Sequence, residues 1–96
     1  MNTASNKRKQ AIMAASAEFL TRVSGRQSLI TVTDADVSPD GRNATIYISV
    51  LPGSANKQAL EFCNRQLSDL REHVGERVRL RTLPHFEVAL DPNIQL

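Results

Sequence analysis

The strongest chemical signal in this sequence is a group of three arginines within five residues, Arg77, Arg79 and Arg81. Crowding like charges is unfavourable unless an anion lies opposite them, and the guanidinium fork matches the oxygens of a phosphate. The group therefore predicts contact with RNA or DNA rather than catalysis. The alternative is pairing inside the protein, for instance Arg77 with Asp69 or Glu76, together with a favourable helix C-terminus.

Basic residues in other segments extend this prediction. Lys7, Arg8 and Lys9 begin a predicted helix, where cations oppose the helix dipole. A bound anion explains that placement, and so does a solvated helix end. Arg26 lies in a predicted loop, and loops often carry recognition residues. Arg71 lies on the polar side of a predicted helix, where surface solubility and RNA contact explain it equally well.

The remaining reactive residues do not support catalysis or metal binding. His73 and His85 are the only histidines, and no carboxylate or cysteine accompanies them at a recognisable ligand spacing. Cys63 is the only cysteine and falls on the apolar stripe of a predicted helix, which favours a buried, inert thiol. No catalytic motif frames a nucleophile, so we expect no catalytic residue and no metal site.

Length and composition fit one compact domain over residues 1–96. Hydrophobic residues make up 41% of the chain and aromatic residues only 4%, which disfavours binding by several exposed stacking rings. The net charge is +2, but the charges are unevenly distributed along the chain. Residues 1–29 carry five basic side chains and one acidic one, a net charge of +4. This distribution favours nucleic acid bound through one face, with ordinary solubilising charge as the alternative.

Neither a membrane span nor a signal peptide is predicted. No stretch approaches the length of an apolar bilayer-spanning helix, and the polar, lysine-rich start lacks the apolar run of a signal peptide. We therefore expect a cytoplasmic protein without membrane contact that acts as a monomer. Residues 1–6 are small and polar, and we expect them to be disordered.

Hydrophobic periodicity predicts the elements that position these residues. Helical spacing indicates a helix over about 7–23, and period-two alternation within 29–51 indicates two strands. The segment 38–42 joins them with proline, aspartate and glycine, the chemistry of a hairpin turn. A slip in the alternation predicts a bulge near Thr33 and Asp34. Tyr47 alternates with the apolar residues, and packing under a helix is favoured over stacking on a base.

The second half of the chain predicts helices followed by a strand. An apolar stripe from Ala59 to Val74 indicates one long helix or two helices joined by a kink, and residues 84–90 alternate as a last strand. The order α-β-β-α(kink)α-β predicts an α+β fold with a three-stranded sheet packed on helices in two layers. Because helices separate the second and third strands, the third strand is expected to pair parallel to a neighbour through a crossover.

Three stretches in this order and spacing resemble the ribosome-binding factor A family. They are LITVT followed by VSPD within residues 29–40, ATIYISVL at 44–51, and VGERVRLRTLPHFEV at 74–88. The family has an Ala-x-Gly kink between its second and third helices. Counting back without gaps, that kink falls here on Gln66, Leu67 and Ser68. The family's Asp-Pro-Arg segment reads Ser24-Gly25-Arg26 here, so only Arg26 matches.

The resemblance implies a type II KH-like fold without catalytic activity or cofactor. It also implies binding to the small ribosomal subunit and its ribosomal RNA during late maturation, with support for processing of the precursor RNA. Two alternatives remain open from the residues themselves. One is a generic basic RNA-binding domain, and the other is a small protein–protein interaction module that docks another polypeptide on its sheet or a helix face.

Overall fold

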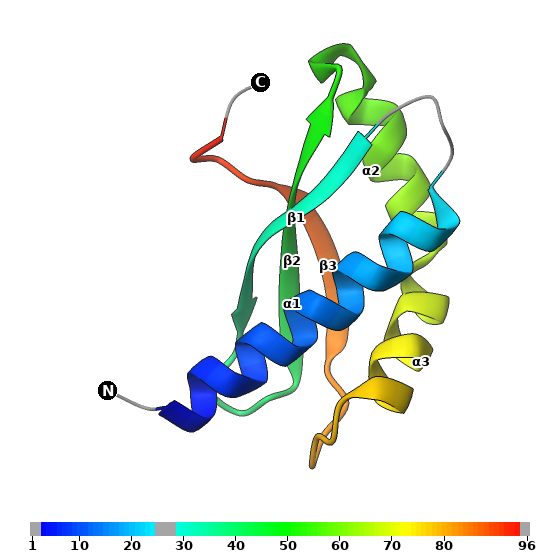
Figure 1. Ribbon diagram of the computed structural model, residues 1–96. Helices are drawn as coiled ribbons and strands as arrows, with labels where there is room; N and C mark the ends of the chain where they lie inside the picture. Colours follow the sequence, from blue (N-terminus) through cyan, green and yellow to red (C-terminus); the bar gives the residue numbers. More distant parts are fainter. Residues whose placement is uncertain (1–2, 25–28, 95–96) are drawn as a thin grey trace.

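The predicted order of helices and strands is confirmed by a computed structural model, which describes residues 3–24 and 29–94. Figure 1 shows α1 crossing in front of the sheet, with α2 and α3 beside it. The elements are α1 (Thr3–Val23), β1 (Leu29–Val37), β2 (Asn43–Leu51), the 3-10 turn η1 (Gly53–Ala55), α2 (Asn56–Arg65), α3 (Leu67–Arg77) and β3 (His85–Leu90).

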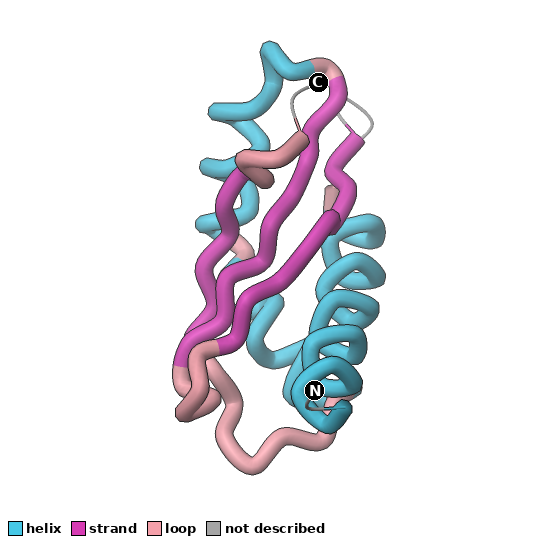
Figure 2. The backbone as a smooth tube through the Cα atoms, turned by 90° about the vertical axis from the view of Figure 1, so that its left-hand side faces the viewer, coloured by secondary structure: helices cyan, strands magenta, loops and turns pink. Residues whose placement is uncertain are grey.

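The three strands form one sheet in the order β1-β2-β3 (Figure 2). β1 and β2 pair antiparallel, and β3 pairs parallel to β2, which confirms the predicted crossover. The register shifts between Val32 and Asp34, so the predicted bulge is also confirmed. Thr33, between these two residues, donates a hydrogen bond from its hydroxyl to Asp91 at 2.6 Å.

The hairpin turn closes for reasons visible in its sequence. Gly41 has φ +73°, a conformation that glycine adopts without steric cost. An Oδ1 atom of Asp40 accepts hydrogen bonds from the Ser38 hydroxyl at 2.6 Å and from the Arg42 backbone N–H at 3.0 Å. The Ser38 hydroxyl oxygen in turn accepts from the Asn43 backbone N–H. This network fixes the end of the sheet nearest the start of α1.

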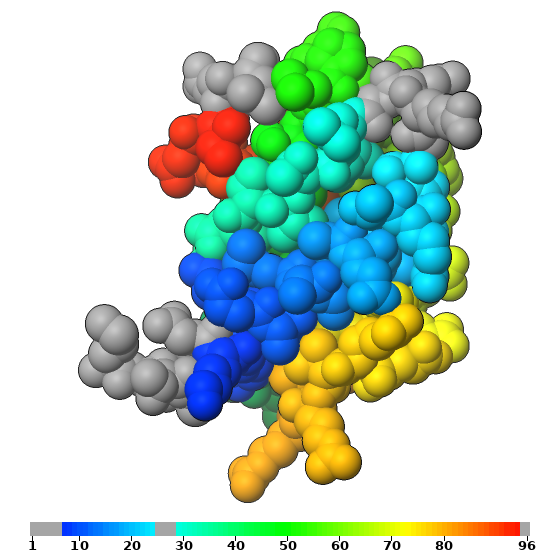
Figure 3. All heavy atoms as spheres, viewed as in Figure 1, coloured from blue at the N-terminus to red at the C-terminus, as the bar shows by residue number. Residues whose placement is uncertain are grey.

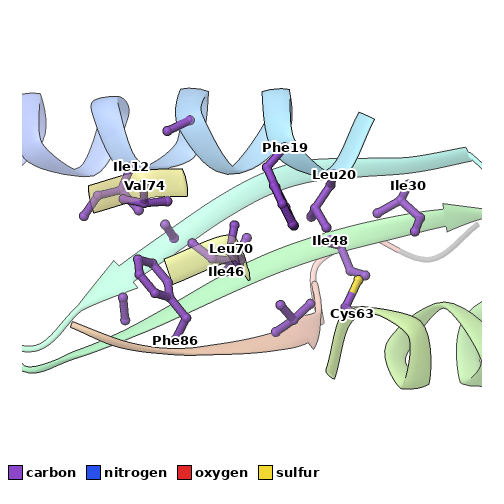
Figure 4. Close-up of a cluster of buried hydrophobic side chains, with 14 of the residues drawn as sticks. Ile12, Phe19, Leu20, Ile30, Ile46, Ile48, Cys63, Leu70, Val74 and Phe86 are labelled. Atoms are coloured by element: carbon purple, nitrogen blue, oxygen red, sulfur yellow. The ribbon is translucent and has the colours of Figure 1, made fainter. Parts of the chain in front are cut away.

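One face of α1 packs onto the sheet and α3 (Figure 4). Its buried residues recur at positions i, i+3, i+4, i+7 and i+8, the stripe of an amphipathic helix. Ile12 and Leu20 are 0% and 1% exposed, and Ile46 and Ile48 of β2 are both 0% exposed. The resulting core joins the described helices and strands through Ile12, Phe19, Leu20, Ile30, Ile46, Ile48, Cys63, Leu70, Val74 and Phe86.

The expected start of the first helix is wrong. α1 begins at Thr3 rather than near residue 7. Of the segment expected to be disordered, residues 3–6 have a helical backbone and residues 1–2 lie outside the described residues. The physical reason is that nothing in this segment breaks a helix. It contains no proline or glycine, and the lysine, arginine, glutamine and alanine residues that follow are good helix formers.

The helical crossover is divided at Gln66. α2 ends at Arg65 and α3 begins at Leu67, while Gln66 has φ −101° and ψ 3°. The Gln66 N–H donates to the carbonyl of Cys63 at 2.9 Å, a tight last turn, and the Gln66 carbonyl accepts from Leu70 at 2.8 Å. The structure therefore has two helices rather than one, with the break inside the segment Gln66, Leu67 and Ser68.

Candidate nucleic-acid interface

A groove at one end of the molecule brings together basic segments that are distant in sequence. It has a volume of about 640 Å³ and lies between the start of α1, the hairpin turn and the segment that links α3 to β3. Figure 3 shows these parts of α1 and the linking segment side by side at the lower end of the molecule. Five cationic residues of the described chain line the groove: Lys7, Arg8, Arg77, Arg79 and Arg81.

The linking segment, residues 78–84, is held at its far end by Arg71. The Arg71 Nε donates a hydrogen bond to the Pro84 carbonyl and its Nη2 donates to the Leu83 carbonyl, both at 3.0 Å. Leu83 also packs so closely on α3 that its Cδ2 would lie 3.0 Å from a Cβ added at Gly75. Arg71 therefore uses its guanidinium inside the protein, which positions the segment that carries Arg79 and Arg81.

Arg79 and Arg81 are free to receive an anion. Both side chains are exposed, and neither has a hydrogen-bond or ion-pair partner among the side chains described, those of residues 7–24 and 29–94. The segment also places them beyond the end of α3, because the Val78 backbone is extended with φ −123° and ψ 129°. Cations held at fixed points without an internal partner are suited to phosphate contact.

Arg77 is paired, although not with the residues expected from the sequence. Its Nη2 lies 3.1 Å from Oε1 of Glu18 on α1, so the suggested partners Asp69 and Glu76 were wrong. α1 packs beside α3, which brings Glu18 within reach. The Arg77 and Glu18 side chains are 54% and 51% exposed, and an ion pair at such a site contributes about 0–1 kcal/mol. An ion pair of this strength adds little to the position of either side chain.

Lys9 faces away from the cationic group. Its Nζ lies 2.8 Å from Oδ1 of Asp34 on β1. This hydrogen bond raises the pKa of Lys9 and lowers the pKa of Asp34, so both groups are charged at neutral pH. The pair fastens α1 to the bulged strand, and Lys9 does not line the groove. Its neighbours Lys7 and Arg8 do line it.

The sheet face turned away from the helices has the opposite charge. Tyr47 is half-buried there, and its hydroxyl donates to Asp36 at 3.1 Å. That hydrogen bond and the nearby carboxylates of Asp34 and Glu87 raise the pKa of Tyr47. The prediction that Tyr47 packs under a helix is therefore wrong, because its alternation with buried Ile46 turns it outward. An acidic outer face disfavours RNA, which favours approach through the groove.

The helix break and the groove are separate sites. Gln66, Leu67 and Ser68 do not line the groove, whereas Arg77 at the other end of α3 does. α3 has 11 residues, and a helix rises 1.5 Å per residue, so the helix break and Arg77 lie roughly 16 Å apart along α3. Arg26, the remaining predicted contact, lies outside the described residues.

The groove also contains residues that sequence reasoning missed. Among the described residues, Asp40 is the one carboxylate that lines it, and the hydrogen bonds from Ser38 and the Arg42 backbone lower the pKa of Asp40. Six apolar residues also line it: Ala11, Ile12, Val37, Val78, Leu80 and Pro84. The sequence assigned Asp40 to a turn and gave no signal that brings it together with these apolar residues, because α1, the hairpin turn and the segment after α3 are distant in sequence.

Other kinds of site are not formed by the described residues. Within residues 3–24 and 29–94, no three side chains of His, Cys, Asp or Glu gather in a way that can hold a metal ion. Cys63 is 1% exposed, which confirms its predicted burial, and desolvation raises the pKa of its thiol to about 11. None of the described helices is long and apolar enough to cross a membrane.

The sequence is similar to a known family over almost its whole length. The family described as "Ribosome-binding factor A" matches residues 4–95. Two curated relatives carry the same name. The relative from Opitutus terrae is 38% identical over 72 residues, and that from Thermodesulfovibrio yellowstonii is 35% identical over 69 residues. The matches cover 73% and 72% of this chain, which spans only 58% of the length of either relative.

Solved structures share the fold. The crystal structure of ribosome-binding factor A from Thermus thermophilus has a TM-score of 0.81, with 24% identity and coverage of 88% of this chain and 93% of that one. A solution structure of a Thermotoga maritima protein described as a putative ribosome binding factor A has a TM-score of 0.74, with 24% identity and coverage of 92% and 87%. Both likenesses confirm the predicted KH-like α+β fold.

A third comparison concerns a complex. A homology model of the Thermus thermophilus protein, fitted into a cryo-electron microscopy map of a complex with the 30S subunit, has a TM-score of 0.74. Its sequence is 26% identical, and the match covers 84% of this chain and 88% of that one.

Proposed function

Because the chain belongs to the ribosome-binding factor A family, we propose that it binds the small ribosomal subunit through ribosomal RNA during late maturation. It supports processing of the precursor RNA without catalysing a reaction itself, and it acts in the cytoplasm as a monomeric single domain. The observation that carries the proposal is the groove in which five cations from the two halves of the chain converge.

The binding mechanism is recognition of backbone phosphates held at fixed spacing. Arg79 and Arg81 make the first contacts, and Arg77 exchanges Glu18 for a phosphate oxygen. Lys7 and Arg8 complete the opposite wall of the groove. Each phosphate contact should make the affinity more sensitive to salt: per contact, the logarithm of the affinity falls by about a further 0.7–0.9 for each tenfold rise in salt concentration. Holding an RNA element at these points keeps it in one arrangement while the subunit matures.

The remaining residues predicted to contact RNA, Lys9, Arg71 and Arg26, do not share the role of the cations that line the groove. Lys9 and Arg71 act by positioning α1 and the segment 78–84, through Asp34 and through two backbone carbonyls. Arg26, which lies outside the described residues, is kept as a further RNA contact. The break at Gln66, Leu67 and Ser68 corresponds to the kink between the second and third helices of the family.

Cosedimentation with ribosomal subunits across a salt series tests the proposal. We expect selective binding to the small subunit that weakens steeply with salt, with purified large subunits as the control. Equal binding to both subunits would support the generic RNA-binding domain instead. Absence of binding to either, with a protein partner recovered, would favour the protein–protein interaction module.

We predict that Asp40→Asn tightens binding to the small subunit by about two- to fivefold at low salt. The substitution removes the one carboxylate that lines the groove among the described residues, whereas the amide oxygen still accepts the turn hydrogen bonds from Ser38 and Arg42. The gain should shrink as salt screens the charge. Glu61→Gln, at an exposed position of α2 away from the groove, is the matched control. Equal or weaker binding by Asp40→Asn would argue against phosphates in the groove.

A further inference from the structure

The face of the sheet turned away from the helices, here the outer sheet face, is an open surface separate from the groove. Its residues alternate with core residues along the three strands: Asp34, Asp36, Thr45, Tyr47, Glu87 and Ala89. None of these six residues lines the groove. We propose that the outer sheet face binds an extended, arginine-rich polypeptide segment, whose guanidinium groups lie on the Tyr47 ring and at the carboxylates of Asp36 and Glu87. This inference goes beyond the proposed function and does not depend on the groove.

The charge of the outer sheet face is the first argument. The three strands contain Asp34, Asp36 and Glu87 but no lysine or arginine, although the chain has 12 such basic residues. The side chains of Asp36 and Glu87 are exposed, and neither forms an ion pair with a side chain that the structure describes. Exposed carboxylates without a cation of their own complement a cationic partner.

An internal contact at the edge of this face shows how it receives a cation. Lys9 reaches from α1 to the edge strand β1, where its Nζ lies 2.8 Å from Oδ1 of Asp34. Asp36 is the next outward-facing residue along the same strand, and it has no such partner among the described side chains. A cation bound at Asp36 would therefore repeat the contact that Lys9 already makes at Asp34.

Tyr47 adds an aromatic ring to the carboxylates. Its hydroxyl donates a hydrogen bond to Oδ2 of Asp36 at 3.1 Å, and this bond is the largest cause of the raised pKa of Tyr47. Asp34 and Glu87 raise the same pKa through their charges, so all three carboxylates lie near the phenol. In the register of the sheet Tyr47 lies opposite Ala89, which is too small to cover the ring. A guanidinium stacks on an aromatic face and pairs with carboxylates, so arginine matches this combination.

The spacing of the acidic residues favours an extended polypeptide over one small cation. Thr45 lies opposite Asp36 on β1 and opposite Glu87 on β3, so the two acidic residues are separated by two strand spacings, about 10 Å. Alternate residues of an extended chain point the same way and lie roughly 7 Å apart, and long side chains span the remaining distance. A single small cation would meet only one of the carboxylates. The described residues also bring together no three side chains that can hold a metal ion.

Chemical-shift mapping by NMR tests the proposal on the unmodified chain. The probe is a short peptide of alternating arginine and serine, and the control peptide alternates glutamate and serine. We expect the arginine peptide to shift the backbone amide signals of Asp36, Tyr47 and Glu87, with smaller changes at the helices. Shifts confined to the helices, or equal effects of the two peptides, would overturn the inference.

A charge variant tests the role of the two carboxylates. Asp36→Asn/Glu87→Gln should weaken binding of the arginine peptide about tenfold at low salt, and the loss should shrink as salt screens the charges. The amide oxygen at position 36 still accepts the hydrogen bond from Tyr47. Asp69→Asn/Glu72→Gln is the matched control, because it removes two exposed charges from α3. Equal losses in the two double variants would show that only net charge matters, which contradicts a site on the sheet.

A second pair of variants tests the ring. Tyr47→Thr removes the aromatic face but keeps a residue suited to a strand, and it should weaken peptide binding about three- to fivefold. Tyr47→Phe keeps the ring and should stay within about twofold of the parent chain. Dispersed amide signals establish that each variant folds. If Tyr47→Thr bound the peptide as tightly as Tyr47→Phe, the ring would have no part in the site and the proposal would fail.

This inference and the proposed function fail independently. Arg79→Ala/Arg81→Ala should bind the arginine peptide at least as tightly as the parent chain, because the two removed cations repel the peptide. Loss of peptide binding in that variant would place the peptide away from the sheet and overturn the inference. Absence of peptide binding to the parent chain would overturn it too, while salt-sensitive binding to the small subunit would still stand.

Discussion

The double variant Arg79→Ala/Arg81→Ala is expected to bind the small ribosomal subunit about 10- to 100-fold more weakly than the parent chain at moderate salt. Both side chains are exposed and have no partner among the described residues, so their removal leaves no unpaired acidic group behind. The unfolding free energy should change by no more than about 0.5 kcal/mol, as for ordinary surface substitutions.

The salt dependence of binding identifies the cause of that loss. If both arginines contact phosphates, the slope of log affinity against log salt should fall by about 1.4–1.8, two contacts' worth. Lys57→Ala/Arg65→Ala is the matched control, because it removes two exposed charges from α2 away from the groove. Equal losses in the two double variants would mean that only net charge matters, and the groove would lose its role.

Arg71→Met should destabilise the protein by about 1–3 kcal/mol and also weaken RNA binding. Methionine retains the apolar stem, but the carbonyls of Leu83 and Pro84 lose both donors. Arg71→Lys should rescue only part of the loss, because one ammonium cannot reproduce the planar pair of N–H groups. Urea unfolding measures the stability, with the exposed Arg65→Met as the control.

The same variant separates the positioning role of Arg71 from a direct contact with RNA, which was one of the two explanations open from the sequence. If Arg71 positions the segment 78–84, Arg71→Met lowers the affinity with an unchanged salt slope, because no phosphate contact disappears. If Arg71 itself contacts RNA, the slope falls by nearly one. A variant as stable as the parent chain would show that the two hydrogen bonds contribute nothing measurable.

Local features of this fold were predictable because neighbouring residues determine them. The hairpin depends on Ser38, Asp40 and Gly41, whose side-chain hydrogen bonds and positive φ close the turn whatever surrounds it. The bulge at Thr33 follows from a slip in alternation within one strand. The parallel last strand follows from connectivity, since two helices intervene before it.

The groove itself was not predictable, since it depends on contacts between distant segments. Lys7 and Arg81 are 74 positions apart in the sequence, and no periodicity states that α1 packs beside α3. For the same reason the partner of Arg77 was missed, because Glu18 lies on another helix. The role of Arg71 was also hidden, since a polar position in a helical pattern does not indicate which carbonyls a long side chain reaches.

The parallel pairing of β3 with β2 has a consequence for the time at which the protein becomes active during its synthesis. The Arg42 carbonyl accepts a hydrogen bond from the His85 N–H at 2.8 Å, so docking of β3 adds an anchor to the segment that carries Arg79 and Arg81, beyond the contacts of that segment with α3. A ribosome delivers the chain from its N-terminus, and Lys7 and Arg8 emerge long before their opposite wall exists. Under the proposed function, a nascent chain whose β3 has not yet docked lacks one wall of the groove, and docking of β3 completes the surface that receives RNA.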